Sequence, residues 1–121
     1  MKGYRIDVFN IVGGALCIEA DDGQSIYEYI QKTLKNGTNI IISFKNIEMV
    51  TTAFLNTAIG QLYREYNKEE ISSRISFEDI SDDIKVKIKR VNQTAKLFYE
   101  DPDRLQRTIN EVLGEQNEQT V

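Results

Sequence analysis

An apolar run between two helical segments constrains the fold of this chain more than any other feature. The run, "NIIISF" at residues 39 to 44, is rich in β-branched side chains and is typical of a strand covered on both faces. Residues 23 to 36 before it carry apolar side chains at helical spacing, and an Asn-Gly pair follows as a helix stop. Residues 53 to 66 after it carry a wide apolar stripe of the same period. This order predicts an α/β fold with a right-handed crossover between parallel strands.

The N-terminal segment is predicted to form a β-hairpin. Apolar and polar side chains alternate over residues 4 to 9, which indicates a strand with one exposed face. Gly13 and Gly14 can then supply the positive backbone angles of a tight two-residue turn, and "LCIEA" follows as a second strand. We therefore expect these two strands to pair antiparallel.

The C-terminal half adds one strand and two helices. The alternation in "EISSRISFED", residues 70 to 79, predicts a half-exposed strand at the edge of the sheet. A third helix should start from a Ser81 cap and continue to Phe98. Asp101 and Pro102 form a helix-start pair for a short last helix, whose apolar side chains are Leu105, Ile109, Val112 and Leu113.

The predicted order of elements is β-β-α-β-α-β-α-α. It corresponds to a four-stranded mixed β-sheet with the helices packed mainly on one face. At 121 residues the chain is long enough for one core but not for two. We therefore expect one domain over residues 1 to 114 and a flexible polar tail over residues 115 to 121.

Composition removes several classes of function. The formal net charge of −4 argues against nucleic-acid binding, and the cations of "KVKIKR" at residues 85 to 90 are better explained as the solvated side of a helix. The chain has no histidine, the commonest general base and zinc ligand, so neither a metal site nor a cofactor is expected. No apolar stretch is long enough to span a membrane, and the single cysteine, Cys17, suits a reducing compartment. We expect a cytoplasmic protein, and its oligomeric state stays open.

Two adjacent threonines, Thr51 and Thr52, directly precede the helix at residues 53 to 66. One explanation is structural, because a threonine at a helix N-cap accepts a backbone N–H and stabilises the helix by about 1 kcal/mol. The other is functional, because ligands and partners of open α/β sheets gather beyond the carboxyl ends of parallel strands. Phe54, one position further on, is expected to be a core residue.

The segments "ALCIEADDG" and "NIIISFKNIEMVTTAFLNTAIGQLY", with the final strand and helix, resemble a STAS domain, the fold of bacterial anti-sigma-factor antagonists. The chain is most similar to a STAS-like offshoot with a hydroxyl-rich helix start, here "SFKNIEMVTTAF" at residues 43 to 54. The resemblance covers roughly residues 4 to 100. It implies the STAS fold and a role in regulation.

In antagonists of this family, a partner that is both a kinase-type ATPase and an anti-sigma factor phosphorylates a serine in an Asp-Ser-x-Gly segment. The resemblance puts the acceptor on Thr51, or on Thr52 if the register differs by one, while Val50 and Ala53 stand at the aspartate and glycine positions. It also implies a partner surface on the loop after the central strand and on the exposed side of the next helix. That surface comprises Lys45, Asn46, Glu48, Thr52, Asn56, Gly60 and Gln61.

Together these features predict a non-enzymatic regulatory module that binds a protein partner, such as a histidine-kinase-type ATPase, and is switched by threonine phosphorylation. The alternative is a small nucleotide- or ligand-binding sensor that uses the helix start at Thr51 and Thr52. An enzyme is not expected, because the sequence offers no pairing of a nucleophile with a base.

Overall fold

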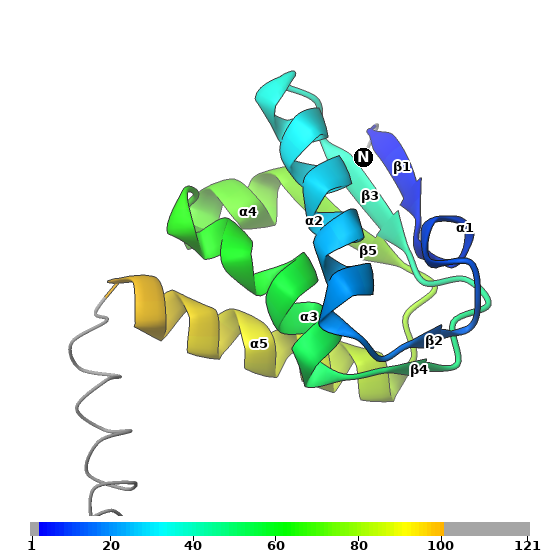
Figure 1. Ribbon diagram of the computed structural model, residues 1–121. Helices are drawn as coiled ribbons and strands as arrows, with labels where there is room; N and C mark the ends of the chain where they lie inside the picture. Colours follow the sequence, from blue (N-terminus) through cyan, green and yellow to red (C-terminus); the bar gives the residue numbers. More distant parts are fainter. Residues whose placement is uncertain (1–2, 101–121) are drawn as a thin grey trace, which may run out of the picture.

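The computed structural model describes residues 3 to 100 and consists of parallel strands and helices (Figure 1). The strands are β1 (Tyr4–Asp7), β2 (Leu16–Cys17), β3 (Ile40–Ser43), β4 (Met49–Val50) and β5 (Ile75–Glu78). The helices are α1 (Val8–Val12), α2 (Ala20–Lys35), α3 (Thr52–Ala58), the 3-10 helix η1 (Gly60–Arg64), α4 (Lys68–Arg74) and α5 (Asp82–Glu100). The α/β class is therefore confirmed.

The strands form two separate sheets instead of one. The larger sheet has three parallel strands in the order β1-β3-β5, and the smaller sheet pairs β2 with β4, also in parallel. The central place of β3 and the edge position of β5 were both predicted. The four-stranded mixed sheet was wrong, because no strand pair within residues 3 to 100 is antiparallel.

The predicted N-terminal hairpin is wrong because its first strand ends early and turns into a helix. The carboxylate of Asp7 accepts a hydrogen bond from the backbone N–H of Asn10 (3.4 Å) and so caps α1. Gly13, with a φ of 85°, ends α1 in the left-handed conformation, and its N–H donates to the carbonyl of Phe9. The first glycine therefore stops a helix, and β2 pairs with β4 rather than with β1.

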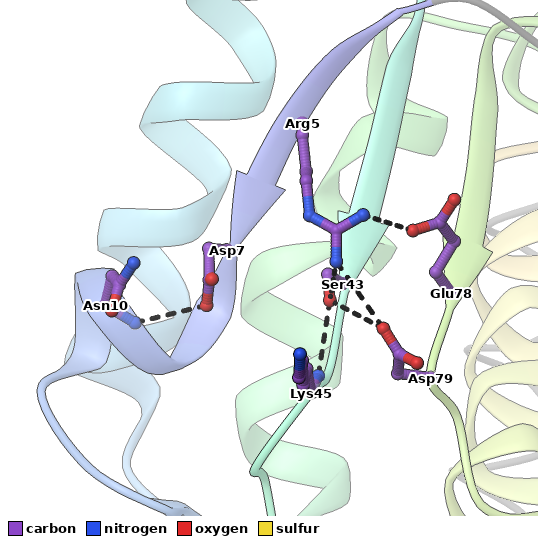
Figure 2. A network of polar contacts seen from close by, with 7 residues as sticks. All are labelled: Arg5, Asp7, Asn10, Ser43, Lys45, Glu78 and Asp79. Carbon is purple, nitrogen blue, oxygen red and sulfur yellow. Dashed lines mark hydrogen bonds and ion pairs between the residues drawn. The ribbon is translucent and has the colours of Figure 1, made fainter.

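The larger sheet is covered by helices on one face. In Figure 1 α2 lies in front of β3, and in Figure 2, which looks onto the other face, the helices lie behind the strands. On the covered face, Ile6, Ile40, Ile42 and Ile75 are at most 5% exposed. They pack with residues of the helices, among them the fully buried Phe54, which confirms that Phe54 is a core residue.

The open face of the larger sheet is held by side chains instead of a helix layer (Figure 2). The guanidinium of Arg5 in β1 pairs with Glu78 in β5 and donates to Ser43 Oγ in β3 (3.0 Å). Ser43 Oγ in turn donates to the carboxylate of Asp79 (3.1 Å). This network crosses all three strands and buries Ser43, so β3 is shielded on its second face by side chains alone.

The helix predicted over residues 53 to 66 is divided in two. The α-helical hydrogen bonding ends at Ala58, and residues from Gly60 to Arg64 continue as η1. Glycine is a poor helix former, which weakens the α-helix at this point. The division turns the chain towards α4.

The strand predicted within residues 70 to 79 is correct only in its second half. Residues up to Arg74 belong to α4, because Asn67 and Glu70 form a capping box that starts a helix. The first long helix, α2, begins three residues before the predicted start, and α5 follows Ser81 as predicted. The predicted last helix, from Asp101 to Leu113, and the tail at residues 115 to 121 lie outside the described residues.

Candidate functional site

The side chain of Thr51 is used entirely within the fold. Its Oγ1 accepts a hydrogen bond from the backbone N–H of Phe54 (3.1 Å), which caps α3, and donates to the carbonyl of Ile18 (2.7 Å). Its backbone N–H donates to the carbonyl of Cys17 (3.0 Å). Thr51 therefore joins β2, β4 and the start of α3, and its hydroxyl has both a donor and an acceptor role already filled.

The neighbouring Thr52 has the opposite character. It is the first residue of α3, its side chain is exposed, and its hydroxyl forms no hydrogen bond within residues 3 to 100. The two threonines that the sequence treats as equivalent are thus a structural cap and a free hydroxyl. Of the two, Thr52 is the accessible one.

Thr52 lies at one end of a shallow groove between α3 and α5. A hollow of about 240 Å³ is lined by Thr52, Asn56, Arg90, Val91 and Thr94. A second hollow of about 210 Å³ shares Asn56 and Thr94 with the first and is completed by Gly60, Ala95, Phe98 and Tyr99. We call these two adjoining hollows together the α3–α5 groove.

The groove carries cationic groups at both ends. Arg90, near Thr52, is exposed and forms no ion pair within the described part of the chain. At the other end the guanidinium of Arg64 lies 5.9 Å from the ring centroid of Tyr99, and its interaction with the Tyr99 side chain raises the pKa of Arg64. One guanidinium group therefore lines the groove and a second lies beside Tyr99 at its other end.

Lys87 connects α5 to β4 next to the groove. Its ammonium group donates to the carbonyl of Val50 (3.0 Å) and pairs with Asp83 (3.0 Å). These contacts fix the start of α5 beside β4, so that Arg90, one turn further on, is held next to Thr52.

The predicted partner surface falls into three places. Thr52, Asn56 and Gly60 meet in the groove, where the buried Gly60 forms part of the floor. Gln61 faces the other way, because its amide donates to Gln24 (3.0 Å) and to the carbonyl of Thr57 (2.8 Å). The exposed Lys45, Asn46 and Glu48 lie on the loop between β3 and β4.

Sequence analysis missed the half of the groove that α5 contributes. Arg90, Thr94 and Phe98 recur every fourth residue and so form one stripe along the helix. That stripe flanks the buried side chains Val91 and Ala95. The sequence shows this spacing, but it does not show that the stripe faces α3.

A separate cavity of about 410 Å³ lies on the other flank of α5. Its lining residues are Tyr63, Lys68, Asn92, Gln93, Lys96 and Leu97. The side-chain oxygen of Asn92 is buried and has no hydrogen-bond partner within residues 3 to 100. The cavity combines apolar walls with two ammonium groups, a lining that suits a small anionic molecule.

The single thiol of the chain lies in the core. Cys17 is fully buried, and this burial, together with the charge of Asp22, raises the pKa of its thiol to about 11. It is therefore a packed thiol rather than a nucleophile. Within residues 3 to 100 no three His, Cys, Asp or Glu side chains gather closely enough to hold a metal ion. No helix in the same part of the chain combines the length and the apolar character needed to cross a membrane.

A family model matches the chain over part of its length. It is described as a STAS-like domain of unknown function (DUF4325), and it covers residues 22 to 85, just over half of the chain. The matched region runs from the start of α2 to the start of α5 and includes both threonines. Comparison with curated proteins found no match, and comparison with solved structures found none either.

Proposed function

The chain belongs to this STAS-like family, and we propose that it is a non-enzymatic regulatory module that binds a protein partner at the α3–α5 groove. Phosphorylation of Thr52 would switch the binding. The observation that carries the proposal is the contrast between the two threonines: the hydroxyl of Thr51 is bonded on both sides, and that of Thr52 is free beside Arg90. The free hydroxyl opens onto a surface depression where a partner can contact it.

The electrostatics of the groove support a partner with an acidic contact residue. Arg90 is the cation nearest to Thr52 in the groove lining, and it forms no ion pair within residues 3 to 100. A phosphate on Thr52 would add nearly two negative charges and would pair with Arg90. The phosphate would therefore compete with a carboxylate of the partner for Arg90 and would also repel that carboxylate.

The shape of the groove supports an apolar contact next to the charged one. Gly60 and Ala95 have little or no side chain, and Phe98 lines the hollow above them. An apolar side chain of a helical partner would fit there, while its acidic residue meets Arg90. The partner class implied by the resemblance to anti-sigma-factor antagonists is a histidine-kinase-type ATPase, which would also transfer the phosphate from ATP to Thr52.

The proposal is tested by incubating the full chain with ATP and such an ATPase and measuring intact mass. We expect the mass to increase by one phosphate in the unmodified chain and in Thr51→Ser, and to stay unchanged in Thr52→Val. Binding should weaken at least about tenfold in Thr52→Glu and in Arg90→Glu, while Lys89→Glu on the same helix leaves it unchanged. Phosphate on Thr51, or equal binding by Thr52→Glu, would refute the groove as the regulated surface.

The cavity beside η1 favours a second candidate function, a ligand-binding sensor. Its volume of about 410 Å³ is large enough for a small molecule, and Lys68 and Lys96 would pair with an anionic group. The site differs from the helix start that the sequence suggested for a nucleotide. A titration with ATP and GTP should raise the melting temperature of the full chain but not of a Lys68→Ala/Lys96→Ala variant. An unchanged melting temperature with both nucleotides would remove nucleotides as the ligand.

A further inference from the structure

Helix α5 exposes one side over most of its length. Five exposed side chains recur on that side at helical spacing, and they are Val86, Lys89, Arg90, Gln93 and Leu97. The side chains that α5 buries in the core lie on the opposite side of the helix. Figure 1 accordingly shows α5 along the border of the described part of the chain. We call the five exposed residues the outer face of α5.

The outer face combines exposed apolar side chains with cations. Val86 and Leu97 are 52% and 46% exposed. Residues 84 to 99 contain four lysines and one arginine but no carboxylate. Of these five cations only Lys87 forms an ion pair within residues 3 to 100, with Asp83. The outer face therefore suits an occupant that has both apolar side chains and carboxylates.

The segment directly after α5 has this composition. Residues 101 to 113 lie outside the described residues, and their sequence has the pattern of an amphipathic helix. The apolar positions of the pattern are Leu105, Ile109, Val112 and Leu113. Residues 101 to 121 carry five carboxylates and two guanidinium groups, so their net charge of −3 is opposite in sign to that of α5.

We propose that residues 103 to 113 fold back onto the outer face of α5 as an antiparallel helix. Pro102 disfavours the helical conformation in Asp101, so the chain can change direction directly after α5. Antiparallel helices are commonly joined by about two to five residues. Eleven helical residues span about 16 Å, which is the distance along α5 from its last turn back to Lys89 and Arg90.

The antiparallel direction brings complementary groups together. Counting back from Asp101, Leu105 would lie close to Leu97, and Glu111 would lie within about one turn of Arg90. A surface ion pair contributes little, so the apolar contact is expected to be the main stabilising one.

A small contact surface is sufficient because the occupant belongs to the same chain. Two separate molecules need about 800 Å² on each partner, since association costs translational and rotational freedom. A tethered segment avoids most of this cost, because its effective concentration at a nearby site is about millimolar. Arg90 also lines the α3–α5 groove, so the docked segment would compete with a partner for this cation. That last consequence rests on the proposed function of the groove, whereas the docking does not.

The docking is tested by hydrogen exchange of the full chain, measured by mass spectrometry on the peptide that contains residues 103 to 113. We expect its amides to exchange at least about tenfold more slowly than those of an unfolded peptide, at every protein concentration. Leu97→Asp should remove this protection. Leu16→Asp is the matched control, since Leu16 is exposed to a similar extent (51%) on β2, and Figure 1 shows β2 far from the last turns of α5. Circular dichroism checks that each variant keeps its fold.

Changes in the segment itself test its orientation. Ile109→Asp should remove the protection as Leu97→Asp does, whereas Asn110→Asp adds the same charge outside the apolar positions and should leave it unchanged. Lys89→Glu/Arg90→Glu should weaken the protection, and Glu111→Lys in the same chain should restore part of it.

Three results would overturn the proposal. The first is exchange as fast as in an unfolded peptide. The second is slow exchange that Leu97→Asp and Ile109→Asp leave unchanged, because a helix that does not contact α5 would behave in this way. The third is protection that increases with protein concentration, because the segment of a second copy would then be the occupant. The measurement needs neither a partner protein nor phosphate, so each of these results leaves the proposed function of the groove standing.

Discussion

Replacing either threonine by the isosteric valine should separate the two roles that the structure assigns to them. Thr51→Val removes one oxygen that bonds on both sides, to the N–H of Phe54 and to the carbonyl of Ile18. Thr52→Val removes an oxygen without a hydrogen bond in the described part of the chain. The two changes are chemically identical and lie one residue apart, so each is a control for the other.

The expected magnitudes follow from the contacts of Thr51. Loss of an N-cap costs about 1 kcal/mol. Loss of the second hydrogen bond costs about 1 kcal/mol more, because water can reach the carbonyl of the half-exposed Ile18 and limit the loss. The total of about 2 kcal/mol lowers the melting temperature by roughly 6 to 12 °C in a chain of this length. Thr52→Val should change the free energy of unfolding by less than about 0.5 kcal/mol.

The assay is denaturant unfolding followed by circular dichroism, with thermal unfolding in parallel. A third variant, Thr51→Ser, keeps the hydroxyl and should recover most of the loss. The reasoning is refuted if Thr52→Val destabilises as much as Thr51→Val, or if Thr51→Ser is as unstable as Thr51→Val.

Three further predictions address the rest of the fold. Gly13→Ala should lower the free energy of unfolding by about 1 kcal/mol, measured by thermal unfolding, because Gly13 has a φ of 85°. Gly14→Ala should be nearly neutral, since a methyl group has open space at both sites but only Gly13 has a positive φ. Arg5→Leu should cost no more than about 1 kcal/mol, because its ion pairs are half exposed, and the difference from the unmodified chain should shrink in high salt. The fold raises the pKa of the Cys17 thiol from 9.0 to about 11. Between these two pH values the thiol ionises in the unfolded chain but not in the folded one, so the free energy of unfolding should fall as the pH rises. Chemical denaturation of Cys17→Ala at the same pH values should lack this dependence.

The sequence predicted the elements whose local pattern and tertiary role agree. The periodicities of α2 and α5 and the apolar run of β3 each have one interpretation, and all three elements were found. The failures occurred where two patterns overlap. Residues 4 to 9 alternate like a strand, but Asp7 and Gly13 are also placed to cap a helix, and the caps decide.

The site was predictable in position but not in its details. The resemblance pointed to Thr51 and Thr52, and these residues do begin α3. What distinguishes them is the contact of Thr51 with the carbonyl of Ile18, which is 33 residues away in the chain. The contribution of Arg90 likewise depends on how α5 packs against α3. No local pattern contains such long-range contacts.

Four consecutive residues connect the β2–β4 sheet with the groove. Met49 is exposed on the sheet, Val50 lies in the core, Thr51 caps α3 and Thr52 lines the groove. Because Thr51 bonds both to the β2 segment and to α3, the small sheet and the groove are held in one fixed relation. Thr51→Val should therefore weaken partner binding at the groove as well as the stability of the fold. Met49→Lys, which lies outside the groove, should leave partner binding unchanged.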